Sequence, residues 1–209
     1  ITGTPTATGS QSVTFDVGDA ANHVGSASFT ITINGLVAIT TTAIPSGIVA
    51  LPYTYTLAST GGLAPLTWSV TPALPKGLTL NASTGVISGT PTAASSASHT
   101  FKVTDSSSPK HSVTKSLKVV VAKASQTITF TSTAPTSPAL GSSYKPTATA
   151  SSGLTVTISK DAKSTSGTCT FASGTFKFVK AGTCIVDAKQ TGNANYTAAP
   201  EVQQQITVP

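Results

Sequence analysis

The chain has 209 residues, with twelve basic and six acidic side chains and a formal net charge of +6. A hydrophobic fraction of 38% beside a charged fraction of 9% excludes disorder of the highly charged kind, because enough apolar side chains are present to form cores. Every basic residue is a lysine, and these lysines are scattered from Lys76 to Lys189. Without the forked guanidinium of arginine, the charge does not indicate nucleic-acid binding. We expect the lysines to keep exposed strands soluble.

The first part of the chain repeats a later part. Residues 1–19 align without a gap on residues 87–105, and after a length change of two residues the alignment resumes. We therefore predict that residues 1–36 are the C-terminal part of a module whose complete copy is residues 37–123. The matching pairs are Phe15 and Phe101, Val17 and Val103, Asp19 and Asp105, Phe29 and Leu117, Ile31 and Val119, and Ile33 and Val121.

The complete copy shows apolar residues alternating with polar ones, in short runs separated by turn residues. This pattern predicts antiparallel strands that bury one face, and hence an all-β sandwich. The expected strands are 38–44, 53–57, 66–70, 78–80, 86–88, one through Phe101 and Val103, and one over 117–121.

Residues 124–209 space their strands and turns differently, but apolar and polar residues alternate in the same way, and this pattern predicts a further sandwich. No window has the apolar spacing of an amphipathic helix, and no apolar run is long enough to span a membrane. The expected strands are 127–132, 147–150, 154–159, 169–171, 175–179, 184–188 and 203–208.

Two resemblances rest on ordered motifs. The first joins LPYTY at 51–55, PLTWS at 65–69, LPKGL at 74–78 and STGVISGTP at 83–91, and it resembles the immunoglobulin-like, cadherin-related repeats of large bacterial extracellular proteins. With the half copy, it covers residues 1 to about 122.

The second resemblance concerns residues 124–209. Their motifs QTITF at 126–130, AGTC at 181–184 and GNANY at 192–196 are similar to a second bacterial immunoglobulin-like repeat.

These resemblances imply tandem immunoglobulin-like β-sandwiches on a secreted or surface-anchored bacterial protein, with no catalytic residue, cofactor or metal ligand to carry over. The expected function is that of a non-enzymatic structural array, such as a stalk, an adhesin or an extracellular filament segment. The alternative is a carbohydrate-binding accessory region of a secreted enzyme. A platform of Trp68, Tyr53, Tyr55 and Phe101 would support that alternative, although the alternation places Trp68 in the core.

Cys169 and Cys184 are the only cysteines and lie on the strands before and after 175–179. An exported chain favours a disulfide between them, and the alternative is a pair of small buried side chains. Zinc is not expected, because no second cysteine pair or nearby histidine completes a tetrahedral site.

The remaining polar candidates do not predict a site. The six carboxylates are isolated in sequence, so calcium, which needs about six oxygen ligands, is not expected. His99 lies on an edge-like strand, and His23 and His111 lie in turns, without a nucleophile motif. A self-formed isopeptide between Lys145 and Asn195, assisted by Glu201, is a further alternative that spacing does not select.

Residues 13–17 and 27–33 predict a hairpin, which we call the early hairpin and which cannot bury its apolar face alone. Because two isolated strands are marginally stable in water, we expect another segment to cover this face. One explanation is that the chain is a segment of a longer array. The other is strand complementation, head to tail, by a neighbouring copy. The expected partners are thus the chain itself or adjacent modules, besides a glycan or cell-surface ligand. The candidate complementation surface consists of Phe15, Val17, Phe29, Ile31 and Ile33.

Overall fold

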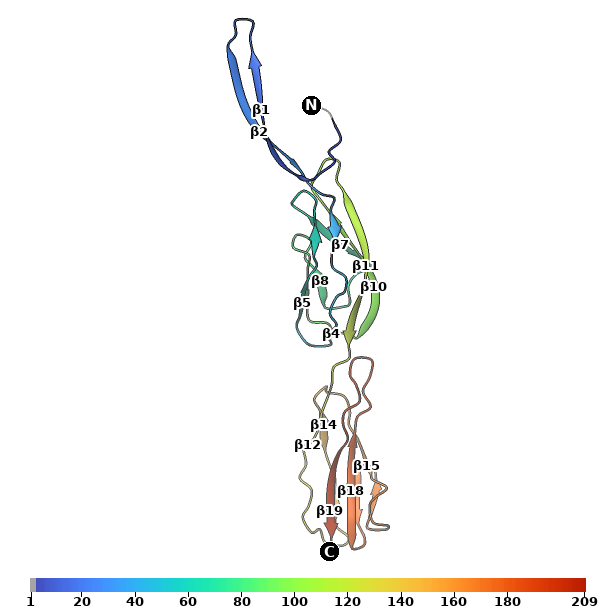
Figure 1. Ribbon diagram of the computed structural model, residues 1–209. Coiled ribbons are helices and arrows are strands. Elements are labelled where there is room, and N and C mark those ends of the chain that lie inside the picture. Colours follow the sequence, from blue (N-terminus) through green and yellow to red (C-terminus); the bar gives the residue numbers. More distant parts are fainter. Residues whose placement is uncertain (1–2) are drawn as a thin grey trace. The chain divides into compact units, whose positions relative to one another are not determined.

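The computed structural model describes residues 3–209, and every regular element in them is a β-strand (Figure 1). The alternation in the sequence predicted this all-β class. The described part contains no helix that could cross a membrane. Contacts between residues divide the chain into two compact units, one made of residues 1–47, 52–91 and 95–120 and the other of 48–51, 92–94 and 121–209. The predicted division into 1–36, 37–123 and 124–209 stays a prediction.

The early hairpin consists of β1 (Gly9–Gly18) and β2 (Val24–Ile33), which pair antiparallel without a bulge from Gly9 opposite Ile33 to Gly18 opposite Val24. The two strands form a sheet of their own. Side chains alternate between the faces of a strand, so residues 12, 14 and 16 lie on one face and 13, 15 and 17 on the other. Threonine and serine hydroxyls bond across the first face, and apolar side chains occupy the second.

Residues 37–123, which we call the middle module, contain two main sheets. A four-stranded sheet has the order β4-β11-β10-β7, and a three-stranded sheet has the order β5-β9-β8. The first sheet contains β4 (Gly47–Ile48), β11 (Ser112–Ala122), β10 (Ser95–Thr104) and β7 (Thr67–Thr71). The second contains β5 (Tyr53–Thr56), β9 (Val86–Gly89) and β8 (Leu78–Leu80), and a small pair is formed by β3 (Ala38–Ile39) and β6 (Ser59–Thr60).

The core of the middle module follows the predicted alternation. Val70 lies opposite Phe101 and Trp68 opposite Val103, and all of these except Val70 are buried. Gly85 leaves room for the indole of Trp68, since a Cβ at this position would lie 2.9 Å from Nε1 and the residue has a φ of +69°. The other buried apolar residues include Leu57, Leu78, Ile87, Leu117, Val119 and Val121.

The predicted strand 38–44 is shorter in the structure, where regular pairing ends at Ile39. Beyond it, the backbone N–H groups of Thr40 and Thr41 both donate to the carbonyl of Ala58, and the Thr41 hydroxyl accepts from the Ala58 N–H. A side chain thus takes the place of a ladder bond, and the strand cannot continue regularly.

Residues 124–209, which we call the last module, have sheets in the orders β12-β14, β13-β17-β16 and β15-β18-β19. Its core joins the strands around Phe176, Phe178, Val186 and Ile206. The strands are β12 (Ile128–Phe130), β13 (Ser143–Tyr144), β14 (Ala148–Ala150), β15 (Thr157–Lys160), β16 (Cys169–Ala172), β17 (Thr175–Phe178), β18 (Gly182–Lys189) and β19 (Val202–Val208).

The first and last segments of the last module run in the same direction. Ala124 forms a parallel bridge with Tyr196, and further along the Gln204 amide donates to the carbonyl of Ser132 at 2.8 Å. The chain therefore enters the module beside Tyr196 and leaves it along β19 at the opposite end.

The middle module has the same polarity. The ammonium of Lys115, near the start of β11, donates to the carbonyl of Ile39 at 3.4 Å, and the N–H of Val49 donates to the carbonyl of Ala122 at the end of β11. The segment 39–49 thus runs alongside β11 in the same direction, and entry and exit again lie at opposite ends.

Candidate functional site

The apolar face of the hairpin is the clearest unexplained surface of the described residues. Phe15 is 41% exposed, Val17 73%, Phe29 56% and Ile31 37%, and Ile33 is half-buried. Their repeat partners Phe101, Val103, Leu117 and Val119 are 5% exposed or less. Within the hairpin the rings of Phe15 and Phe29 contact each other, with centroids 5.8 Å apart. We call Phe15, Val17, Phe29, Ile31 and Ile33 the hairpin face.

The loops at the ends of β1 and β10 support the repeat in atomic detail. Asp19 donates its N–H to the carbonyl of His23 and accepts the His23 N–H at 2.9 Å on Oδ1. Asp105 donates its N–H to the carbonyl of His111 and accepts the His111 N–H at 2.8 Å on Oδ1. In the complete copy, Asp105 Oδ2 also accepts from the N–H of Leu63 at 3.5 Å. The loop of the hairpin therefore repeats the backbone hydrogen bonds of the 105–111 loop, and among the described residues Asp19 has no counterpart of the bond to Leu63.

Ser107, His111 and Asp105 lie together, but they do not form a catalytic relay. The Ser107 hydroxyl contacts both Asp105 Oδ1 at 2.6 Å and His111 Nδ1 at 2.9 Å. A relay needs the histidine between the other two, using both ring nitrogens. Here the aspartate binds the serine directly and accepts backbone N–H groups, so the three residues brace a turn.

We expect the Asp105 turn to make stability depend on pH. Hydrogen bonds from the Ser107 hydroxyl and the His111 N–H lower the pKa of Asp105 to about 2, below the value near 3.9 of an unfolded aspartate. Because the folded pKa is the lower one, the stabilisation is complete above about pH 4 and is lost as the pH falls toward 2. NMR titration of the carboxyl carbon measures the pKa directly.

Ser107→Ala removes the largest cause and should move this pKa upward, toward the unfolded value. In Asp105→Asn, the decline of unfolding free energy between pH 4 and pH 2 should become shallower. An acid limb unchanged by both substitutions would contradict the assignment.

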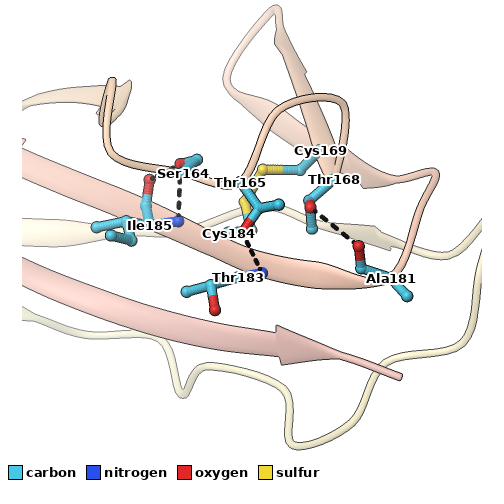
Figure 2. Close-up of a disulfide and its surroundings, with 8 residues drawn as sticks. All are labelled: Ser164, Thr165, Thr168, Cys169, Ala181, Thr183, Cys184 and Ile185. Atoms are coloured by element: carbon cyan, nitrogen blue, oxygen red, sulfur yellow. Dashed lines mark hydrogen bonds between the residues drawn. A yellow bond between two sulfur atoms is a disulfide. The ribbon is translucent and has the colours of Figure 1, made fainter.

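A disulfide joins Cys169 and Cys184, with a Cα–Cα distance of 5.9 Å (Figure 2). Cys169 begins β16 and Cys184 lies on β18, and these strands belong to different sheets. The bond therefore crosses the sandwich, and both residues are buried in the core beside Phe176 and Phe178.

Hydroxyl groups continue the ladder of β18 next to the disulfide. Beyond the end of β15, Ser164 Oγ accepts the N–H of Ile185 at 3.0 Å, and Thr165 Oγ1 accepts the N–H of Thr183 at 3.1 Å (Figure 2). The buried Thr168 donates to the carbonyl of Ala181 at 3.3 Å. The segment before Cys169 is thus fixed to β18 by side chains as well as by the disulfide.

Three carboxylates that are isolated in sequence come together in the last module. Ligand oxygens of Asp161, Asp187 and Glu201 all lie within 4.8 Å of one another. A cation of the chain already lies among them, because Lys189 Nζ is 3.2 Å from Asp187 and 3.4 Å from Glu201. The amide of Gln203 contacts all three carboxylates.

This arrangement balances buried charge within the chain. The hydrogen bond with Asp187 raises the pKa of Lys189 and keeps it protonated. A backbone hydrogen bond from Lys163 lowers the pKa of Asp161. The sequence alone does not reveal the cluster, because only the pairing of β18 with β15 and β19 brings these positions together. Glu201, considered above as the carboxylate that would assist an isopeptide between Lys145 and Asn195, contacts Lys189 instead.

The comparison with family models matches residues 36–133 to the family described as "Putative Ig domain". Residues 36–133 thus resemble an immunoglobulin-like domain, and the antiparallel sheets of the middle module are of that fold class. The match agrees with the resemblance drawn from the motifs between residues 51 and 91. No curated protein matches the chain.

Solved structures similar to the chain include human CDH23 EC21-23, at 15% identity over 96% of this chain and 74% of that one, with a TM-score of 0.43. Mouse clustered PcdhgC3 EC1-3 has 14% identity over 96% and 77%, with a TM-score of 0.40. A Bacteroides fragilis protein described as a putative alpha-galactosidase has 26% identity over 42% of this chain and a TM-score of 0.38. This chain spans 18% of that protein's length.

The aromatic residues of the immunoglobulin-like domain do not form an exposed platform. Trp68 is 5% exposed and Phe101 is fully buried. The hydroxyls of Tyr53 and Tyr55 donate to the carbonyls of Pro45 and Ala43. These four residues therefore serve the packing of the domain, and the carbohydrate-binding alternative loses the surface on which it depended.

His99 of the immunoglobulin-like domain differs from its expected edge position. It is 4% exposed on β10, which lies between β11 and β7, and its Nδ1 donates to the carbonyl of Pro72 at 3.1 Å. Its Nε2 has no hydrogen-bond partner among the described residues. The repeat places Val13 at the equivalent position, which is consistent with a packing role for His99.

Proposed function

We propose that the chain is a load-bearing spacer in a structural array at a bacterial surface, in which immunoglobulin-like modules follow one another along the sequence. The observation that carries the proposal is the polarity of both modules, since each is entered at one end and left at the other. Tension along the chain then pulls neighbouring strands past each other, and several ladder hydrogen bonds must break together.

The chemistry of the polar residues supports the same role. Ser107, His111 and Asp105 brace a turn, and the three clustered carboxylates bind Lys189 and Gln203. An extracellular location is consistent with the inter-sheet disulfide, because such bonds persist in oxidising compartments.

Extension of single molecules tests the proposal. Pulled from its ends, the chain should show separate unfolding events for the middle and last modules. In the oxidised last module the loop that the disulfide closes stays closed, and its two cysteines, Cys169 and Cys184, are 15 positions apart in the sequence. Reduction should therefore lengthen the extension gained in that event by about 5 nm.

The middle module contains no cysteine and is the internal control, because its event should be the same in both redox states. A chain that extends without resolved events would contradict the load-bearing role. If reduction left the extension unchanged, this would contradict the expectation that the loop closed by the disulfide lies in the segment that unfolds under force.

A further inference from the structure

The middle module shows what covers a hairpin of this kind. There β10 and β11, the repeat partners of β1 and β2, lie with Phe101 and Val103 fully buried, and residues 37–91 supply the rest of the sandwich. The same apolar positions are present in the hairpin, and its loop repeats the hydrogen bonds of the Asp105 loop although it is two residues shorter. The covering segment is what the hairpin lacks among the described residues.

We propose that the hairpin face binds the first part of another immunoglobulin-like module, a segment with the strand order of residues 37–91 that lacks its own last two strands. The bound segment would complete a sandwich around Phe15, Val17, Phe29, Ile31 and Ile33. This inference goes beyond the load-bearing role and does not depend on it.

The register of the middle module specifies the contact. On β7, Val70 lies opposite Phe101 and Trp68 opposite Val103, so the incoming strand should place its equivalent residues opposite Phe15 and Val17. The free edge of β1 offers the N–H and C=O groups for this ladder, because in the described residues β1 pairs only with β2. The free edge of β2 is available to the equivalent of β4 in the same way.

The loop adds a polar contact. Asp105 accepts the N–H of Leu63 on Oδ2, whereas the equivalent oxygen of Asp19 contacts the ring of His23 at 2.9 Å. The side chain of Asp19 is 58% exposed. It can therefore turn to accept an N–H from the incoming segment.

A complete second copy of the chain is the poorer occupant. Its residues 37–91 are already covered by its own β10 and β11, whose apolar side chains are buried. Its hairpin offers two strands, whereas in the middle module β10 and β11 are flanked by β7 and β4 in their own sheet and accompanied by the second sheet β5-β9-β8. The hairpin face thus fits a module part whose last two strands are not its own.

Binding of an excised fragment tests this inference. The probe is residues 37–91, labelled with 5-fluorotryptophan at Trp68, and it is titrated with the unlabelled chain. We expect saturable binding, with a shifted fluorine resonance as the indole becomes buried, and protection of β1 and β2 amides from hydrogen exchange. Phe15→Asp and Val17→Lys should each weaken binding by roughly 30-fold or more, the effect of losing a central interface contact.

Ser12→Asp is the matched control, since residue 12 lies on the opposite face of β1 and the substitution adds the same charge. Val17→Lys is the second variant because it should fold normally, since Val17 is 73% exposed in the free chain. Absence of binding would overturn the proposal, and so would binding of the probe to Phe15→Asp and Val17→Lys that is as tight as its binding to the unsubstituted chain. The latter result would mean that the probe exchanges into the middle module. Self-association of the chain through the hairpin face, seen in sedimentation without the probe, would also overturn it in favour of a second copy.

Discussion

Phe101→Ala is expected to lower the free energy of unfolding of the middle module by about 3–5 kcal/mol, because it leaves a cavity in a packed core. Phe101 is fully buried on β10, opposite Val70. Its repeat partner Phe15 is 41% exposed, and Phe15→Ala should change this value by less than about 1 kcal/mol. The same residue type at equivalent positions of one repeat thus separates the effect of burial from that of the side chain.

Urea unfolding followed by tryptophan fluorescence makes this comparison, because Trp68 is the only tryptophan and lies in the middle module. Equal effects of the two substitutions would contradict the assignment of the hairpin to an uncovered half module. An equally large loss of unfolding free energy in Phe15→Ala would indicate that the Phe15 side chain is buried in solution.

Reduction of the disulfide should destabilise the last module by about 3 kcal/mol in the chain-entropy model, since the bond joins cysteines 15 positions apart in the sequence. The loss should be largest around β18, which the disulfide joins to β16 of the opposite sheet. Hydrogen exchange read out by mass spectrometry should therefore show faster exchange in β16 to β18 after reduction.

The double variant Cys169→Ala with Cys184→Ala controls for reagent effects and should behave as the reduced wild type does, apart from a small cavity. The Trp68 transition of the middle module should stay unchanged in both. A last module that unfolds at the same denaturant concentration with and without the bond would contradict the proposed stabilisation.

The sequence predicted most strands of both modules, because half-buried antiparallel strands show their alternation directly. Strands such as Leu78–Leu80 have the predicted bounds. The short strands Gly47–Ile48 and Ser59–Thr60 were missed, since two residues are too few to show a period. The predicted strand 38–44 was too long, because alternation does not reveal that the Thr41 side chain replaces a ladder bond.

The hairpin face was predictable because a repeat gives each residue a partner whose environment can be compared. The carboxylate cluster was not, since its members become neighbours only through strand register. Asp187 lies opposite Gln203 on one side and Ser159 on the other, and neither pairing can be inferred from local sequence. A site built from distant strands therefore needs the sheet order before its chemistry can be recognised.

The disulfide also affects how the chain reacts with oxidants. Both cysteines are held in it, and the 209 residues include no methionine. Oxidants therefore find neither a thiol nor a thioether, the two sulfur groups that peroxides convert most readily. The one indole is 5% exposed, behind the strands that pack on it. A protein that is not renewed once outside the cell keeps its covalent structure longest with such a composition.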